Sequence, residues 1–407
     1  MQPSSLSKSG IRSYVLVTVA YWGFTVTDGA LRMLVLLYFH TLGYSPLEVA
    51  MLFLFYEFFG IITNLFGGWI ASRWGVKLTL YGGIAMQIVA LLLLMPVNQS
   101  WAIALAVPYV MCAQAISGIA KDLTKMSSKS AIRLVIPQDA QSLLFKWVAI
   151  LTGSKNALKG VGFFLGGLLL STVGYVNALL VMVIGLFTVL LSSQWLPAKM
   201  GQVKTKVKFR QLFSKSSEIN VLSAARFFLF GARDVWFVVG LPVFLYSILG
   251  WSFEQVGGFL ALWVIGYGLV QSLAPLLLRQ FGASQSPQAS TIQFWTGILI
   301  LIPAAIAIAL QFGYTPAPTI VVGLLVFGIV FALNSAVHSY LVLAYTEDNK
   351  VALNVGFYYM ANSGGRLVGT VLSGLVFQLY GLTGCLWVSA ILVLLAEIVT
   401  LRLPEPN

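Results

Sequence analysis

Two stretches of the chain decide the fold: Lys159-GVGFFLGGLLLSTV-Gly174 and Arg366-LVGTVLSGLVFQLY-Gly381. They align at an offset of 207 residues, with a cation first, a glycine last and further glycines in register between them. Gly43 aligns with Gly250 at the same offset. One unchanged offset over so much of the chain indicates an internal repeat, in which the second half of the molecule copies the first.

The composition places both copies in a membrane. Of 407 residues, 59% are hydrophobic and 9% are charged, whereas soluble domains average roughly 45–50% and about 25%. The mean hydropathy is +0.91. A soluble chain cannot hide so much apolar surface, so a soluble enzyme, a disordered chain and a disulfide scaffold are excluded. The net charge of +12 would suggest nucleic acid in a soluble protein, but here it relates to the lipid bilayer, and we expect no nucleic-acid partner.

Twelve apolar segments are long enough to span a membrane, for which about 20 residues are needed. They are residues 13–39, 47–72, 77–96, 101–120, 146–171, 176–196, 219–248, 254–279, 290–311, 318–344, 351–378 and 382–402. We therefore predict an all-α membrane protein with twelve transmembrane helices in a 6+6 pseudo-symmetric arrangement. The predicted domains are an N-terminal six-helix bundle (1–195), a basic cytoplasmic linker (196–218) and a C-terminal six-helix bundle (219–407). Parallel repeats of this kind are typical of transporters with a site between the halves.

Basic residues predict the orientation. Lysines and arginines gather in the connections on one side, whereas opposite connections such as 40–46, 96–100 and 312–318 contain none. The excess of basic residues on the inner side places both termini in the cytoplasm. The connection 121–141 is long and partly apolar, so it predicts either an interfacial helix or an extension of the fourth span.

Charged residues inside the predicted spans cost roughly 2.5–3.5 kcal/mol each on insertion scales and therefore need an explanation. Six cations face three acids: Arg32, Lys155, Lys159, Arg226, Arg233 and Arg366 against Asp28, Glu57 and Asp234. An interior that held all of them would keep about three uncompensated positive charges. An anionic small-molecule substrate with more than one negative charge would compensate them, and arginine is suited to phosphate-like oxyanions.

The predicted substrate-binding residues are cations of spans one, five, seven and eleven together with a polar stripe in span eleven: Arg32, Lys155, Lys159, Arg233, Arg366, Tyr358 and Asn362. The predicted coupling or gating residues are Asp28, Glu57, Asp234, His338 and Arg73.

Structural alternatives remain open for several of these residues. Asp28 and Arg32 share a helix face and could form a salt bridge within one helix. Lys155 could pair with Glu57, and His338 could be a hydrogen-bonded core residue. We interpret Arg226 as an interfacial residue that extends its charge to the headgroups.

No catalytic motif accompanies these charges. The sequence contains no phosphate-binding loop of the ATPase type, its two histidines lie far apart, and Cys112 and Cys385 show no metal-binding spacing. We therefore expect a protein that is not an enzyme and has neither a cofactor nor a metal site. The pairs and runs of glycine at 162, 166–167, 364–365 and 369 predict close helix packing.

The junction between spans two and three, Gly68-WIASRWGV-Lys77, resembles the cytoplasmic signature of the major facilitator superfamily. The resemblance implies the 6+6 fold and a gating role for Arg73. Ser72 stands where the family usually has an aspartate, so the gating chemistry at this junction departs from the family pattern.

Longer stretches, including Asn354-VGFYYMANSGGRLV-Gly369 and residues 27–46, 54–75, 151–170 and 223–244, resemble the ArsJ-type organoarsenical efflux permeases of bacteria. The resemblance implies a protein of the bacterial inner membrane that confers arsenate resistance. We expect this protein to be a monomer. Such permeases work with a glyceraldehyde-3-phosphate dehydrogenase that uses arsenate in place of phosphate. They export its product, 1-arseno-3-phosphoglycerate, which carries an oxyanion at each end.

Three other functions compete with this one. The nearest is a permease for other organic phosphates or metabolite anions. A membrane-embedded receptor or assembly subunit is disfavoured by the repeat and by the surplus of intramembrane cations. A membrane enzyme is disfavoured because no catalytic constellation is present.

Overall fold

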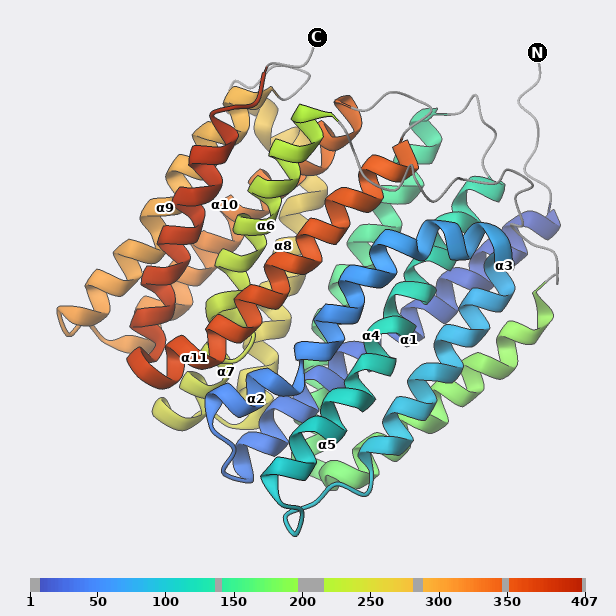
Figure 1. Ribbon diagram of the computed structural model, residues 1–407, viewed down its shortest axis with the longest axis horizontal. Helices are drawn as coiled ribbons and strands as arrows, with labels where there is room; N and C mark the ends of the chain where they lie inside the picture. The colour runs from blue at the N-terminus through green and yellow to red at the C-terminus, as the bar shows by residue number, and fades with distance from the viewer. Residues whose placement is uncertain (1–7, 136–140, 197–215, 281–287, 346–350, 405–407) are drawn as a thin grey trace.

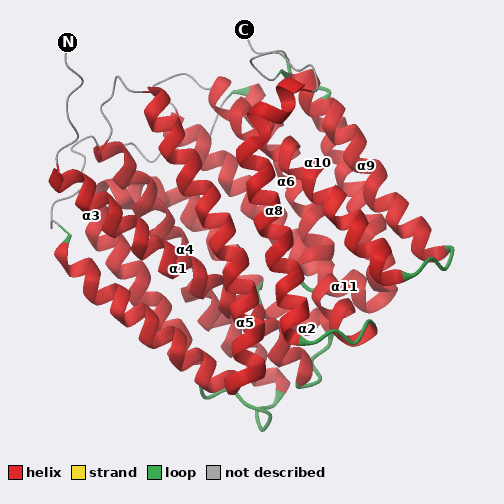
Figure 2. Cartoon of the chain, turned by 180° about the vertical axis from the view of Figure 1, so that it is seen from behind, coloured by secondary structure: helices red, strands yellow, loops and turns green. Residues whose placement is uncertain are grey.

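The computed structural model describes residues 8–135, 141–196, 216–280, 288–345 and 351–404. The described part consists of helices joined by short connections, and Figure 2 shows no strand in it. The principal helices are α1 (Lys8–Thr41), α2 (Pro46–Leu52), α3 (Leu54–Leu94), α4 (Ile103–Val135), α5 (Gln141–Ser192), α6 (Ser217–Phe237), α7 (Gly240–Val243), α8 (Phe253–Gln280), α9 (Ala289–Gln311), α10 (Pro316–Ala344) and α11 (Val351–Thr400).

Three of these helices each contain a break at a glycine. Gly75 in α3, Gly174 in α5 and Gly381 in α11 have φ angles of 78°, 77° and 65°. Residues that carry a Cβ atom rarely adopt such positive φ angles. Glycine therefore permits the chain to reverse direction at these positions. All three breaks fall between segments that the apolar pattern separates. Gly174 and Gly381 are also equivalent positions of the repeat.

Nine stretches of the described helices are long and apolar enough to cross a membrane. Two of them, Gly153–Trp195 and Asn354–Thr400, contain 43 and 47 residues, about twice what one crossing requires. Each of these two stretches is interrupted by a glycine break, at Gly174 or at Gly381. Each therefore agrees with two predicted spans joined at that glycine. The total of twelve spans and the side of the membrane that holds the termini stay predictions.

The fourth segment is longer than predicted. Its expected end was residue 120, but α4 continues without interruption to Val135. The alternative of a helical extension is therefore correct, and Lys121 and Lys125 lie within a helix. The predicted linker 196–218 lies mostly outside the described residues.

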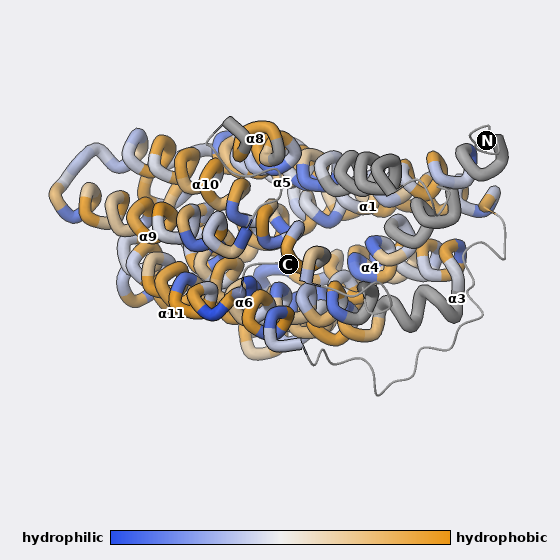
Figure 3. The backbone as a smooth tube through the Cα atoms, turned by 90° about the horizontal axis from the view of Figure 1, so that it is seen from above, coloured by the Kyte–Doolittle hydropathy of each residue, from blue (hydrophilic) through white to orange (hydrophobic). Residues whose placement is uncertain are grey.

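The helices α1–α5 lie on one side of the molecule and α6–α11 on the other (Figure 1). We call these two sets the N-terminal helices and the C-terminal helices. Figure 3 shows the same division from above, with hydrophobic residues along most of the tube. Leu262 and Leu301 are 68% and 67% exposed. Leucine side chains with this exposure are expected where a surface faces lipid rather than water.

Glycines allow close contact between the helices that carry the charged residues. A Cβ atom on Gly162 of α5 would overlap the Val26 carbonyl oxygen of α1. A Cβ atom on Gly365 of α11 would overlap the Phe227 carbonyl oxygen of α6. The predicted role of these glycines in helix packing is confirmed. The two contacts bring Asp28 close to Lys159 and Asp234 close to Arg366.

Replacing Gly365 by Ala should destabilise the protein, because the added methyl group would force α6 and α11 apart. We expect the free energy of unfolding to fall by about 1–3 kcal/mol, the usual cost of overpacking. Urea unfolding in mixed micelles would measure it. Gly266→Ala in α8 is the matched control, since apart from its own stretch of helix no described atom lies within 4 Å of its Cβ position. A change in Gly365→Ala no larger than that in the control would contradict the packing argument.

Candidate functional site

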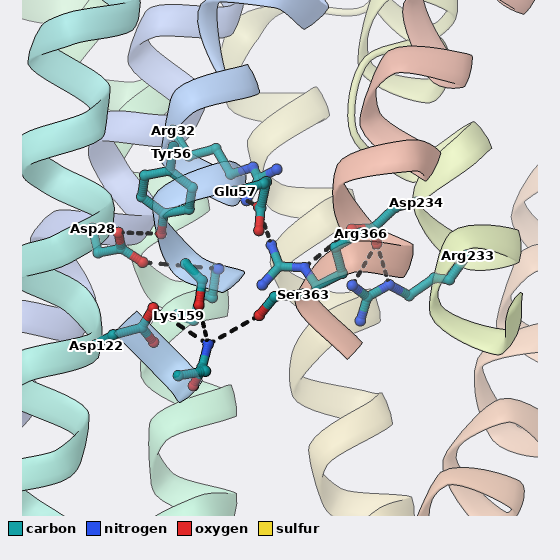
Figure 4. Close-up of polar contacts among 12 residues, drawn as sticks. Asp28, Arg32, Tyr56, Glu57, Asp122, Lys159, Arg233, Asp234, Ser363 and Arg366 are labelled. Carbon is teal, nitrogen blue, oxygen red and sulfur yellow. Dashed lines mark hydrogen bonds and ion pairs between the residues drawn. The ribbon is translucent and has the colours of Figure 1, made fainter. Parts of the chain in front are cut away.

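Glu57 of α3 connects the N-terminal and C-terminal helices. Its side chain is fully buried. The Oε1 atom accepts a hydrogen bond of 3.1 Å from Arg32 Nη1 of α1 and one of 2.6 Å from Arg366 Nη2 of α11 (Figure 4). One carboxylate oxygen is therefore shared by two guanidinium groups from opposite sides of the molecule. The other oxygen, Oε2, is buried without a hydrogen-bond partner among the described residues.

Asp234 of α6 continues the network into the C-terminal helices. Arg366 Nε donates to Asp234 Oδ2 at 3.1 Å, and Arg233 Nε donates to Asp234 Oδ1 at 2.6 Å. Asp234 is 1% exposed. Arg366 thus lies between two buried carboxylates, and each of these carboxylates also contacts a second arginine. Figure 4 shows the continuous series of contacts from Arg32 to Arg233.

Asp28 of α1 forms a second group beside this network. The Tyr56 hydroxyl donates to Asp28 Oδ1 at 2.6 Å, and Lys159 Nζ of α5 lies 3.8 Å from Asp28 Oδ2. Asp28 and Arg32 therefore pair with other helices, so the alternative of a salt bridge within α1 is wrong. The space between Asp28, Arg32 and Tyr56 is too narrow for a water molecule.

A polar cluster on α4 was missed by the sequence reasoning. Asp122 is 1% exposed and receives hydrogen bonds from Lys125 Nζ at 2.5 Å and from Thr63 Oγ1 at 2.9 Å. Lys121 Nζ lies 4.0 Å from the centre of the Tyr56 ring. The sequence carries a signal that would have found the cluster, because these residues continue a polar stripe of α4 at helical spacing: Gln114, Ser117, Lys121 and Lys125.

Two polar contacts between the N-terminal and C-terminal helices are equivalent in the repeat. Asn64 Nδ2 donates to Ser363 Oγ at 3.0 Å, and Asn156 Nδ2 donates to Gln271 Oε1 at 3.4 Å. Adding the repeat offset to Asn64 gives Gln271, and adding it to Asn156 gives Ser363. The same pair of positions therefore makes contact on both sides of the axis that relates the two sets of helices.

Arg226 of α6 is buried rather than interfacial, so its interpretation as a residue that reaches the headgroups is wrong. It is 4% exposed. Its Nε donates to Asn362 Oδ1 at 3.0 Å, and its Nη1 donates to Ser335 Oγ at 2.9 Å. The hydropathy pattern placed Arg226 near the end of a span, but the helix packs with this residue directed into the C-terminal helices, where neutral acceptors bind it.

The structure brings most of the predicted site residues into the central network or into the group beside it: Arg32, Glu57, Arg366, Asp234 and Arg233 in the network, and Asp28 and Lys159 in the neighbouring group. Tyr358 and Asn362 lie apart from it and contact Arg226. Lys155 is half-buried one turn before Lys159, and the ion pairs of Glu57 are with Arg32 and Arg366. His338 is 1% exposed on α10. The side chain of Arg73 lies outside the described residues.

Positive charge is in excess around the network. The central network, the group around Asp28, the α4 cluster, Lys155 and Arg226 together contain eight cations and four carboxylates: Arg32, Lys121, Lys125, Lys155, Lys159, Arg226, Arg233 and Arg366 against Asp28, Glu57, Asp122 and Asp234. The formal excess of four is larger than the sequence suggested. An interior with this balance favours the entry of anions. No group of three or more metal-binding side chains occurs among the described residues.

Comparisons with known proteins agree on the fold. A family model described as the Major Facilitator Superfamily matches residues 14–314. No curated protein matches the sequence.

Three solved structures resemble the chain over nearly its whole length. A single-substitution mutant of the nucleoside transporter NupG has a TM-score of 0.72 at 16% identity, with 97% of this chain and 99% of that chain covered. A D-xylose-proton symporter has a TM-score of 0.72 at 15% identity, with 98% and 99% covered. A bacterial homologue of the iron transporter ferroportin, in an outward-facing state, has a TM-score of 0.67 at 15% identity, with 96% and 99% covered. At these identities the likeness concerns the fold alone.

Proposed function

The chain belongs to the Major Facilitator Superfamily, and from this premise we propose that it exports the organoarsenical anion 1-arseno-3-phosphoglycerate by alternating access. As a member of this family, the protein is a multi-pass membrane transporter of small molecules rather than an enzyme. The proposal adds the substrate, the direction of transport and the location in a bacterial inner membrane. Resistance to arsenate would follow, because the product made from arsenate would leave the cell.

The observation that carries the proposal is the sharing of Glu57 by Arg32 and Arg366. A carboxylate of the protein lies between two arginines from opposite sides of the molecule, in a region with excess positive charge. An arsenate or phosphate group presents several acceptor oxygens to arginine, whereas Glu57 uses one oxygen for both contacts. A substrate oxyanion would therefore replace Glu57 as the partner of these arginines and increase the number of charge-assisted hydrogen bonds.

Alternating access follows from this exchange of partners. Without substrate, the ion pairs from Arg32 through Glu57 to Arg366 hold the N-terminal and C-terminal helices together. A substrate that binds Arg366 and Arg32 weakens the contact with Glu57 and shifts the population toward another arrangement of the helices. The carboxylates that are released become able to take up protons. Asp28, Glu57 and Asp234 are the proposed coupling residues, and Arg73 is the proposed cytoplasmic gate.

The chemical identity of the substrate comes from the resemblance to ArsJ-type permeases. A molecule with an arsenate at one end and a phosphate at the other matches a site that draws cations from both sets of helices. The partner would be the glyceraldehyde-3-phosphate dehydrogenase that produces it. A second candidate, a permease for ordinary organic phosphates or other metabolite anions, is favoured by the same excess of positive charge.

Transport into inside-out membrane vesicles tests the proposal. The outer bath contains arsenate, glyceraldehyde 3-phosphate, NAD and the purified dehydrogenase, and arsenic inside the vesicles is measured. We expect accumulation that requires all four components and is absent from vesicles that lack the protein. Accumulation of arsenate without the dehydrogenase would overturn the organoarsenical substrate. Equal accumulation of labelled 1,3-bisphosphoglycerate, which the dehydrogenase forms when phosphate replaces arsenate, would favour the second candidate.

A further inference from the structure

Arg226 differs from the other buried arginines because it has no acidic partner. Arg32, Arg233 and Arg366 each contact a carboxylate. Among the described residues, no Asp or Glu oxygen lies within 4.0 Å of the Arg226 guanidinium. Removing a charge from water without an opposite charge costs several kcal/mol. The burial of Arg226 is therefore unexplained by the ion pairs of the central network.

Neutral groups hold the Arg226 guanidinium in a fixed position. Asn362 and Ser335 accept hydrogen bonds from Nε and Nη1 at 3.0 and 2.9 Å. The guanidinium carbon lies 3.9 Å from the centre of the Phe230 ring and 5.1 Å from that of Tyr358. The third nitrogen, Nη2, has no hydrogen bond to the described residues. The side chain is thus oriented on two sides while its full positive charge remains uncompensated.

Two further side chains near this guanidinium each carry a buried polar atom without a partner among the described residues: Tyr358, whose ring centre lies 5.1 Å from the guanidinium carbon, and His338, one turn after Ser335 on α10. The Tyr358 hydroxyl and His338 Nδ1 have no hydrogen-bond partner among the described residues, and their side chains are 0% and 1% exposed. Buried polar atoms without partners are uncommon in native proteins. A tyrosine hydroxyl donates to an oxyanion, and an imidazole nitrogen donates when it carries the proton. These two atoms and Nη2 are three hydrogen-bond donors on α11, α10 and α6, of the kind that bind a phosphate-like group.

The position of this group relative to the central network suits a substrate with two charged ends. Arg226 precedes Arg233 by two turns on α6, and Asn362 precedes Arg366 by one turn on α11. At 1.5 Å per residue, the two arginines of α6 are about 10 Å apart along the helix. Both groups are therefore reached from the same pair of helices, α6 and α11.

We propose that Arg226, with Asn362, Ser335, Tyr358 and His338, forms an oxyanion subsite that binds one charged end of the substrate. The ligand class is a phosphate or arsenate group on a small metabolite. Arg226 supplies the charge, Tyr358 and His338 supply further donors, and Asn362 and Ser335 orient the guanidinium. The central arginines bind the other end. This inference rests on the proposed function, since it assigns a second contact to the same anionic substrate.

Binding of 3-phosphoglycerate to the purified full-length protein tests the subsite separately from transport. Isothermal titration calorimetry would compare the unmodified protein with Arg226→Gln and with Arg402→Gln as control. Arg402 is exposed just beyond the end of α11 and contacts no site residue. Because Arg226→Gln removes charge-assisted hydrogen bonds to the ligand, it should weaken 3-phosphoglycerate binding roughly 10- to 100-fold. Arg402→Gln should leave the affinity unchanged.

A second variant keeps the test valid if Arg226→Gln fails to fold. Asn362→Asp has nearly the same shape and places a carboxylate beside Arg226 Nε. This carboxylate should raise the melting temperature by pairing the buried cation, and it should weaken 3-phosphoglycerate binding at least ~10-fold by competing for that cation. If Arg226 had only a structural role, Asn362→Asp would raise the melting temperature without weakening 3-phosphoglycerate binding.

The outcomes separate the subsite from the proposed function. If Arg226→Gln and Asn362→Asp bind 3-phosphoglycerate as the unmodified protein does, the subsite is wrong, while organoarsenical transport in vesicles would still support the proposed function. Loss of binding in Arg402→Gln to the same extent would also overturn the subsite. If the unmodified protein binds none of 3-phosphoglycerate, phosphate and arsenate, both the subsite and the proposal of an anionic substrate are overturned.

Discussion

Replacing Glu57 by Gln should lower the free energy of unfolding by about 3–5 kcal/mol, the range for breaking a buried ion pair by removing one partner. The substitution keeps the shape of the side chain but leaves Arg32 and Arg366 without the charge that they share. Arg366 retains Asp234, whereas Arg32, among the described residues, retains the faces of Phe53 and Tyr56 and a neutral amide oxygen in place of the carboxylate. Urea unfolding of the purified protein in mixed micelles would measure the loss.

The matched control for this experiment is Glu218→Gln at the start of α6. Glu218 interacts with Ser216 and with the first turn of its helix, so its replacement should cost less than about 1 kcal/mol. Equal losses in the two variants would show that Glu57 is not the main partner of the two arginines. A large loss in Glu57→Gln alone would support its role as the connection between the two sets of helices.

Replacing Arg366 by Ala should reduce transport by roughly 100-fold or more while the protein remains folded. The expected loss of transport follows from the two or more charge-assisted hydrogen bonds that arginine makes to an oxyanion. The protein should remain folded because each carboxylate that Arg366 contacts keeps a second partner. Glu57 retains Arg32, and Asp234 retains Arg233. The initial rate of arsenic uptake into inside-out vesicles is the measurement.

Two control variants, Arg366→Lys and Arg402→Ala, allow the result for Arg366→Ala to be interpreted. Arg366→Lys keeps the charge and loses the planar fork, so we expect a rate between those of the unmodified protein and Arg366→Ala. Arg402→Ala removes an exposed arginine and should transport normally. Near-normal transport by folded Arg366→Ala protein would exclude Arg366 from substrate binding, and aggregation of Arg366→Ala would contradict the argument from the remaining ion pairs.

The positions of the helices were largely predictable from the sequence, because they depend on local properties. The predicted segments 254–279 and 290–311 correspond to α8 (Phe253–Gln280) and α9 (Ala289–Gln311). An apolar run has to form a helix in a bilayer, and a glycine is needed where the chain reverses with positive φ. The end of α4 was wrong because Lys121 and Lys125 looked like residues outside the membrane. Lys121 contacts Tyr56, which lies in another helix, α3. Lys125 pairs with Asp122, which shares a helix with it only because α4 continues beyond residue 120.

The partners of the charged residues were less predictable, because they depend on how the helices are rotated about their axes. Asp28 and Arg32 are four residues apart and face the same side of α1, yet they bind Lys159 and Glu57. The composition correctly indicated too many cations for the available acids. It did not indicate that Arg226, among the buried arginines that the structure describes, would lack an acidic partner, because a hydropathy profile gives depth in the membrane and not the direction of a side chain.

The paired contacts Asn64–Ser363 and Asn156–Gln271 have a consequence for the origin of the molecule. In a symmetric homodimer, a contact from position A to position B always occurs twice, once in each direction. Here one position holds Asn64 and Gln271, and the other holds Asn156 and Ser363. All four side chains are polar. Such a pattern is what a self-associating ancestor of half this length would leave after gene duplication and fusion. The ancestral interface would have survived as the boundary between the halves, while Glu57 and Asp234 arose afterwards at positions without an acidic counterpart.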